Sequence, residues 1–413
     1  MNNDMERKYQ IDTDENRLFL KEMTGELLDF GKNFPSPGGS SWYLEDDGTP
    51  RKEHPRETWI TARMAHVYSI GTILGYAGSK ELAESAVEGL RGELHDDVYG
   101  GWYAGLTSDN GILPSKQCYA HAFVMLAASS AVLAGIEGAD DLLKNAVDIY
   151  DKKFWNEDEG LACDTWNTEF TVLDDYRGLN SNMHSVEAFM AIADATGDAG
   201  YRERAGRVIG RIRKWAENNE YRIPEHYTKD WEIQLQLNID KKDDQFKPYG
   251  ATPGHGIEWS RLILQWALSM FRKESKEYAD WRNFAEKLYE RAVSDGWNAD
   301  GAPGIVYTTD WEGRPVVHDR MHWTLAEAIN TSACLYGVTK NPVYAQNYSD
   351  FMKYLDKYVR DKKNGSWFHQ LSRNNEVIRT VWPGKPDIYH AFQATLIPYH
   401  RADMSIAAAC KSV

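Results

Sequence analysis

The chain has 413 residues, of which 42% are hydrophobic, and a formal net charge of −15. This acidic balance argues against nucleic acid or an anionic membrane as a partner, and no apolar run reaches membrane-spanning length. Four cysteines without CxxC spacing and a polar beginning unlike a signal peptide predict reduced thiols and a cytoplasmic protein. GxGxxG, P-loop and HExxH motifs are also missing from the sequence, which argues against the nucleotide and zinc sites they mark.

Helix pairs are the predicted building unit. Apolar, alanine-rich helices alternate with more charged ones along the chain. The apolar helices are predicted to begin near Glu57, Ser115, Ser181, Thr252, Met321 and Pro386, and their charged partners to cover about 79–92, 141–153, 200–218, 277–295, 343–360 and 15–31. Repeated pairs form either an open solenoid or a closed toroid. Six pairs close an (α/α)6 barrel, so we predict an all-α fold with the apolar helices inside.

One domain accounts for most of the chain in this prediction. It covers 14–400, between a polar N-terminal tail at 1–13 and a C-terminal tail at 401–413. Short β-hairpins are expected at 304–318 and 366–381, in loops at the barrel mouth.

The six predicted inner helices begin with unusually polar segments. In a toroid these ends surround one mouth, and buried polar groups need partners. A ring of such groups therefore predicts a polar ligand. Its candidate members are Trp59, Arg63, Tyr119, His184, His255, Glu258, Trp323, Glu327, Asp387 and His390.

The fourth helix start shows the pattern most clearly. Thr252 is a plausible N-cap and Pro253 suits the first helical position, which puts His255 in the first turn. The positive end of the helix dipole disfavours imidazolium there, so His255 is expected to be a neutral base. Glu258 follows on the same helix face. The alternative is that both residues only cap the helix.

For three other polar residues, a purely structural role is an alternative to ligand binding. Arg63 is predicted either to bind a ligand or to form a salt bridge with Glu187 or Glu258. His121 has a possible structural role in the core, and for His66, well inside its helix, that role is the better prediction.

Two histidine–glutamate pairs are candidates for metal binding. His184 with Glu187 and His255 with Glu258 share one spacing, and each pair is a possible metal half-site. No third ligand is apparent in the sequence, so we predict no metal.

The available side chains limit the chemistry. Nothing resembles a nucleophile elbow, and no serine or cysteine is adjacent to a base. Histidines, glutamates, an arginine and aromatics suit proton transfer at a carbon next to a carbonyl, with histidine as general acid and base. They also suit glycoside cleavage by paired carboxylates.

Several motifs in order resemble the N-acylglucosamine 2-epimerase superfamily from about residue 14 to 400. The resemblance is closest to its aldose–ketose isomerase branch, which includes enzymes for D-mannose and for sulfoquinovose. The motifs are Thr58-Trp59-Ile60-Thr61-Ala62-Arg63-Met64, Tyr99-Gly100-Gly101-Trp102-Tyr103, Asn182-Met183-His184-Ser185-Val186-Glu187, Thr252-Pro253-Gly254-His255-Gly256-Ile257-Glu258-Trp259 and Asp387-Ile388-Tyr389-His390.

This resemblance implies a cofactor-free enzyme with a monosaccharide bound at the barrel mouth. His255 and His390 would form the catalytic acid/base pair acting through a cis-enediol(ate). We favour His390 for the C1/C2 proton and His255 for ring opening, and the reverse assignment stays open. Arg63, Tyr119, His184, Glu258 and Trp323 are the implied sugar contacts.

Two departures from the sulfonate-recognising branch bear on the substrate. That branch has glutamine where this chain has His369 and Pro386, and only Arg63 remains of its anion-binding set. The resemblance therefore favours D-mannose and D-fructose, with D-lyxose and D-xylulose as a poorer pair. The alternatives are a sugar 2-epimerase, a sulfoquinovose isomerase, a glycoside hydrolase on the same barrel and a non-catalytic helical scaffold. Oligomeric state is not predicted.

Overall fold

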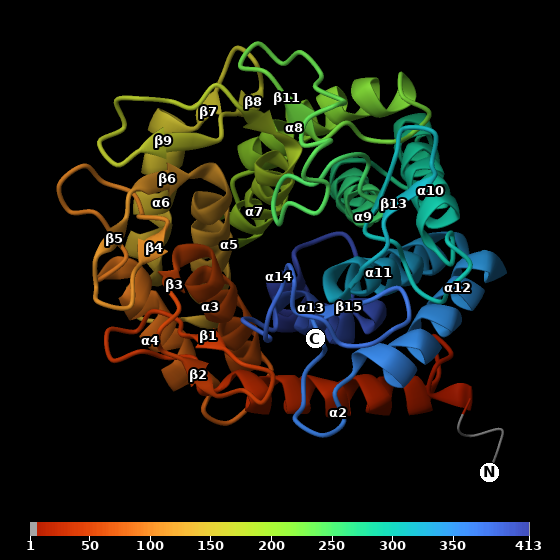
Figure 1. Ribbon diagram of the computed structural model, residues 1–413, viewed down its shortest axis with the longest axis horizontal. Helices are drawn as coiled ribbons and strands as arrows, with labels where there is room; N and C mark the ends of the chain where they lie inside the picture. Colours follow the sequence, from red (N-terminus) through yellow and green to blue (C-terminus); the bar gives the residue numbers. More distant parts are fainter. Residues whose placement is uncertain (1–5, 413) are drawn as a thin grey trace.

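The computed structural model describes residues 6–412. Figure 1 shows two concentric rings of helices around a central axis. Each inner helix packs against the next, and the last returns to the first, which closes the predicted toroid. The inner helices are α3 (Thr58–Ile73), α5 (Cys118–Ala134), α7 (Leu179–Thr196), α9 (Pro253–Met270), α11 (His322–Thr339) and α13 (Tyr389–Leu396).

The outer ring supplies one partner for each inner helix, and the pairs are α2/α13, α4/α3, α6/α5, α8/α7, α10/α9 and α12/α11. A π-helical segment, η1 (Leu355–Val359), continues α12. The outer helices are α2 (Asp14–Gly31), α4 (Ser79–Arg91), α6 (Ala139–Lys153), α8 (Gly200–Glu217), α10 (Lys276–Gly296) and α12 (Pro342–Tyr354). The predicted helix pairs are thus confirmed, with boundaries displaced by no more than about one turn.

Burial explains the two rings. In α5 nearly every side chain from Cys118 to Ala131 is buried, as expected of a helix surrounded by others. In α4 the buried side chains form a stripe that includes Ala83, Val87 and Leu90, so one face contacts the inner ring and the other faces solvent. Gly135 ends α5 in the left-handed conformation, with φ of 71°, where a residue without Cβ is favoured.

Short antiparallel strands fix the starts of the inner helices. The pairs β3/β4, β6/β9, β10/β11 and β14/β15 hold the residues that directly precede α3, α5, α7 and α11. The strands are β1 (Tyr43–Leu44), β2 (Pro50–Arg51), β3 (Arg56–Glu57), β4 (Gly105–Leu106), β5 (Ile112–Leu113), β6 (Ser115–Gln117), β7 (Trp155–Asn156), β8 (Leu161–Ala162), β9 (Thr165–Asn167), β10 (Arg177–Gly178), β11 (His226–Tyr227), β12 (Thr308–Thr309), β13 (Pro315–Val317), β14 (Arg320–Met321) and β15 (Gln370–Leu371).

Both predicted hairpins are present. The first is β12 with β13. The second turns between Ser372 and Glu376, and a bridge joins Leu371 to Val377, while β15 also pairs with β14.

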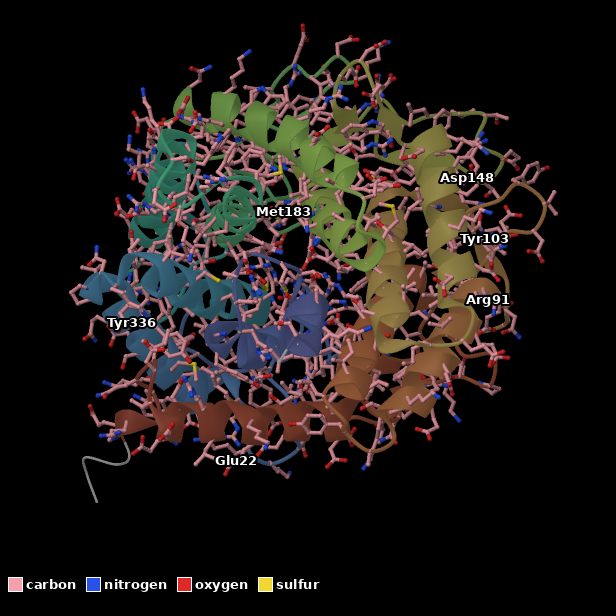
Figure 2. The ribbon with its side chains drawn as sticks, turned by 180° about the vertical axis from the view of Figure 1, so that it is seen from behind. Glu22, Arg91, Tyr103, Asp148, Met183 and Tyr336 are labelled. Carbon is pink, nitrogen blue, oxygen red and sulfur yellow. The ribbon has the colours of Figure 1, made fainter. Side chains whose placement is uncertain are left out.

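The chain ends pack against the barrel where they are described. Lys8 and Tyr9 of the predicted N-terminal tail both donate to Asp356, at 2.9 and 2.7 Å. After α13 the chain forms η2 (Ile397–Tyr399) and α14 (Ile406–Lys411), and α14 contacts α3, α5 and α7. Figure 2 shows these C-terminal helices in the middle of the ring, seen from behind. Residues 1–5 and 413 of the two predicted tails lie outside the described residues, and no described helix is long and apolar enough to cross a membrane.

Candidate active site

A pocket lies where the inner helices begin. It brings together eight of the ten predicted site residues: Arg63, Tyr119, His184, His255, Glu258, Trp323, Asp387 and His390.

The other two predicted site residues lie just outside this pocket. The Trp59 indole donates to Glu57 and lines the adjoining groove. Glu327 lies one helical turn below Trp323, beneath the pocket floor, where it contacts His390 and Arg261.

His255 occupies the first turn of α9, as predicted, but its carboxylate partner is different. Its Nδ1 lies 3.1 Å from Oε1 of Glu225, the residue before β11, and Glu258 does not orient it. Because a carboxylate accepts, the proton sits on Nδ1 and Nε2 is left for a ligand. Thr252 has the extended backbone of an N-cap, yet its hydroxyl makes no capping bond.

His390 is arranged in the same way as His255 but is more deeply buried. Its Nδ1 lies 3.1 Å from Oε1 of Glu327, and its side chain is 5% exposed. Burial, followed by the positive charge of Arg63, lowers the pKa of His390 well below its ordinary value. The ring is therefore neutral at pH 7 and its free Nε2 can accept a proton.

Trp323 packs against both histidines. Its ring centroid lies 4.9 Å from that of His255 and 6.0 Å from that of His390. Gly254 permits the approach, since a Cβ there would lie 2.6 Å from Cζ3 of Trp323. The indole thus fixes the orientation of both rings and offers an apolar wall to a sugar.

The pocket floor holds two glutamates around one arginine. Nε of Arg261 donates to Oε2 of Glu327 at 2.8 Å, while its Nη2 lies 3.7 Å from Oε1 of Glu258. Burial and the negative charge of Glu327 raise the pKa of Glu258 well above its ordinary value of 4.5. Glu258 consequently keeps a proton that it can donate to a bound sugar, whereas Glu327 stays paired with Arg261.

Glu258→Gln should change how stability depends on pH. A carboxyl whose folded-state pKa is raised stabilises the fold at low pH, and that stability is lost as pH rises above 4.5, the ordinary value. The amide cannot ionise, so the variant does not lose this stability. Its free energy of unfolding should rise relative to that of wild type by up to about 1.4 kcal/mol per pH unit across that window. Urea denaturation from pH 4 to 8 measures this. Glu88→Gln, at an exposed position on α4, is the control, and parallel curves for wild type and Glu258→Gln would contradict the protonated state.

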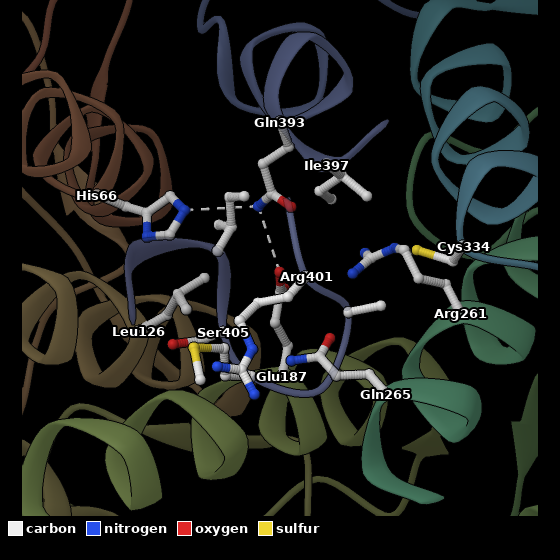
Figure 3. A pocket seen from close by; sticks show the side chains of 13 residues that line it. His66, Leu126, Glu187, Arg261, Gln265, Cys334, Gln393, Ile397, Arg401 and Ser405 are labelled. Atoms are coloured by element: carbon white, nitrogen blue, oxygen red, sulfur yellow. Dashed lines mark hydrogen bonds between the residues drawn. The ribbon is translucent and has the colours of Figure 1, made fainter. Parts of the chain in front are cut away.

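A second cavity lies behind this floor, on the side closed by the C-terminal segment. Figure 3 shows Gln393 pointing toward both His66 and Glu187. Gln393 donates to Oε1 of Glu187 at 3.3 Å, and Glu187 also accepts from Tyr389 at 2.5 Å and contacts His184 at 3.2 Å. Glu187 therefore supports His184 from below, and His66 belongs to the core, as favoured from the sequence.

Arg63 has a partner that the sequence did not suggest. Its Nη1 lies 3.1 Å from Oδ2 of Asp387, and Nη2 donates to the Tyr119 hydroxyl at 2.8 Å. Of the two alternatives predicted for Arg63, the salt bridge to Glu187 or Glu258 does not form, because Asp387 just before α13 is nearer. Arg63 enters the pocket with its charge already matched.

Among residues 6–412, two groups of three side chains are close enough to hold a cation, and both include Glu258: His184 with Glu187, and Glu327 with His390. The sequence had suggested no third ligand. Arg261 already supplies positive charge beside Glu258 and Glu327, and the proton on Glu258 removes one anionic ligand. These features favour a site that works without a metal.

The pocket also contains side chains that sequence reasoning did not assign to the site. Some lie in the segment between α8 and α9 or in the loop after α10, where no periodic pattern marks a position, and Asn180 lies in the first turn of α7. Of these residues, the sequence singled out only His369, as a departure from the sulfonate-recognising branch. The full set is Asn180, Gln245, Phe246, Pro248, Tyr307, His322, His369 and Trp382.

A barrel of this kind, with a histidine- and glutamate-lined mouth, matches a known family. The family model for N-acylglucosamine 2-epimerase matches residues 38–394, and the chain belongs to that family. It is 41% identical over 385 residues to a D-mannose isomerase of Pseudomonas cannabina pv. alisalensis, covering 93% of this chain and 92% of that one. It is 38% identical over 400 residues to a D-mannose isomerase of Thermobifida fusca, covering 96% and 97%. A crystal structure of D-mannose isomerase superposes with a TM-score of 0.84 at 26% identity, covering 92% of this chain and 96% of the other.

Proposed function

We propose that this protein is a cofactor-independent aldose–ketose isomerase that interconverts D-mannose and D-fructose, with D-lyxose and D-xylulose as a poorer pair. The observation that carries the proposal is the pair of histidines in one pocket, His255 and His390, each with Nδ1 on a carboxylate and Nε2 free. The D-mannose isomerases to which the chain is similar support the choice of sugar. The four free cysteines support a cytoplasmic location.

The first step is opening of the pyranose ring. His255, through Nε2, takes the proton of the O1 hydroxyl and returns it to O5 as the C1–O5 bond breaks, which leaves the open-chain aldehyde. Its Nδ1–H stays on Glu225 at 3.1 Å and holds the ring in place while the charge changes.

The second step moves a proton between carbons. His390 removes the C2 proton through Nε2, and the electrons form a cis-enediolate whose negative charge develops on O1. The imidazolium is stabilised by Glu327 at 3.1 Å, and protonated Glu258 donates a hydrogen bond to O1.

The third step completes the ketose. His390 returns its proton to C1, and the O2 hydroxyl proton passes to O1 as the C2 carbonyl forms. The net change is one proton from C2 to C1 and one from O2 to O1, with no external oxidant.

A neutral sugar suits this pocket better than a sulfonated one. The guanidinium of Arg63 is engaged by Asp387 at 3.1 Å and is not free for a second anion. The net charge of −15 also gives no general attraction for an anionic sugar.

Proton NMR of D-mannose with the protein in D₂O tests the proposal. D-fructose is the expected product, with deuterium at C1 in those turnovers in which the proton on His390 exchanges with solvent before it reaches C1, and turnover should be unaffected by EDTA. Glucose as the product would indicate a 2-epimerase, and a requirement for an added divalent cation would contradict the cofactor-free mechanism. If mannose, lyxose and glucose all remain unchanged, the proposed function is wrong.

A further inference from the structure

His322 is a buried polar side chain that the proton-transfer steps leave without a role. It is the first residue of α11, is 6% exposed and lines the pocket. Its Nε2 has no hydrogen-bond partner. An unpaired buried polar atom carries a free-energy penalty, so one beside a ligand pocket points to a contact that the ligand completes.

The contacts of His322 define what Nε2 can do. Its Nδ1 lies 3.4 Å from the backbone carbonyl oxygen of His369. A carbonyl oxygen only accepts, so the ring proton is on Nδ1 and Nε2 carries the lone pair. Nε2 therefore offers the pocket a hydrogen-bond acceptor.

His369 stabilises this neutral form. The two imidazoles stack with centroids 3.6 Å apart and planes 18° from parallel, and Nε2 of His369 donates to the Asp387 carbonyl oxygen at 3.1 Å. Burial lowers the pKa of His322 to about 4 and that of His369 well below its ordinary value. The start of α11 also disfavours a cation, so the acceptor persists at neutral pH.

We propose that His322 is a specificity-determining residue, which accepts a hydrogen bond from one hydroxyl of the sugar through Nε2 and so selects hydroxylated, uncharged sugars. A sulfonate at that position would present only acceptor oxygens to the lone pair and would be rejected. This inference rests on the proposed function for its substrate class, and it adds the group that distinguishes a hydroxyl from an anion.

The test compares two variants on a series of sugars. His322→Phe keeps a ring to stack on His369 and removes Nε2, whereas His322→Gln retains an acceptor oxygen. His400→Phe is the matched control, because His400 bonds the Leu396 carbonyl oxygen and does not line the pocket. Isomerisation and binding are measured with D-mannose and its 3-, 4- and 6-deoxy derivatives, and binding is followed by tryptophan fluorescence, since Trp323 and Trp382 line the pocket.

Loss of one hydroxyl should remove the effect of the substitution. His322→Phe should lower kcat/KM and affinity for D-mannose on the order of 10-fold to 100-fold. For one deoxy sugar it should match wild type, and His322→Gln should recover part of the loss on D-mannose. His400→Phe should behave as wild type on every sugar.

Two patterns would overturn the role of His322: an equal loss on all the sugars, or no loss on any. Thermal melts check folding, and if His322→Phe is destabilised it is replaced by His322→Leu, which also lacks an acceptor and is judged by the same criteria. A wild-type protein that binds mannose without converting it defeats the proposed function alone, because the binding series still tests His322. A wild-type protein that neither binds nor converts these sugars defeats both.

Discussion

Replacing His390 by asparagine is expected to slow isomerisation of D-mannose by about 10²- to 10⁴-fold, the range for loss of a general acid/base. Asparagine Nδ2 takes the place of Nδ1, so the hydrogen bond to Glu327 survives and the fold is preserved. The loss should lie in kcat, with mannose still bound. His255→Asn should give a similar loss, since its amide likewise keeps the bond to Glu225. Activity retained in both variants would refute the acid/base pair.

A sugar that cannot form a ring distinguishes the role of His255 in ring opening from that of His390 in proton transfer between C2 and C1. D-glyceraldehyde is too short for a furanose or pyranose, so its isomerisation needs no ring opening. On this substrate the defect of His255→Asn should shrink, while that of His390→Asn should remain. The opposite result would give the C1/C2 proton to His255 and ring opening to His390.

The helix pairs and the mouth were predictable because their signals are local. The alternation of apolar and charged helices needs only the neighbouring residues, and a polar segment at the start of a buried helix is visible in the sequence. The family resemblance predicted from those motifs is confirmed, and the predicted sugar agrees with the names of the relatives. The catalytic roles of His255 and His390 stay predictions.

The partners of those residues were not predictable, because they come from distant parts of the chain. Glu225 reaches His255 through the pairing of β10 with β11, and neither strand has a strong local pattern. Asp387 reaches Arg63 from 324 residues away. Spacing along α9 suggested Glu258 as the partner of His255. Residues on one helix face need not be in contact, however, and the carboxylate that contacts His255 is that of Glu225, which lies outside α9.

The arginine in the pocket floor, Arg261, likewise has a partner from another helix, Glu327 of α11. Nothing in the sequence around Arg261 indicates its role, yet it is 4% exposed and contacts Glu327 and Glu258. Its positive charge compensates the buried carboxyl groups of Glu258 and Glu327, which lie close together in the pocket floor. The carboxylate that supports His390, Glu327, is therefore itself held by the charge of Arg261.

Arg261→Met is accordingly expected to destabilise the protein by about 3–5 kcal/mol, the cost of leaving a buried charge without its partner. The loss should be greater at pH 8 than at pH 5. Without the arginine the folded-state pKa values of Glu258 and Glu327 rise further, and stability that depends on bound protons is lost as pH rises. Urea denaturation at the two pH values measures both effects.

Two further variants show whether charge or packing is responsible. Arg204→Met makes the same change at a partly exposed pair with Asp151 and should cost less than about 1 kcal/mol. Adding Glu327→Gln to Arg261→Met removes one uncompensated charge, so the double variant should be more stable than Arg261→Met at pH 8. If Arg261→Met is no worse than Arg204→Met, or if Glu327→Gln only adds to its loss, then Arg261 fills space in the floor and does not hold its carboxylates together.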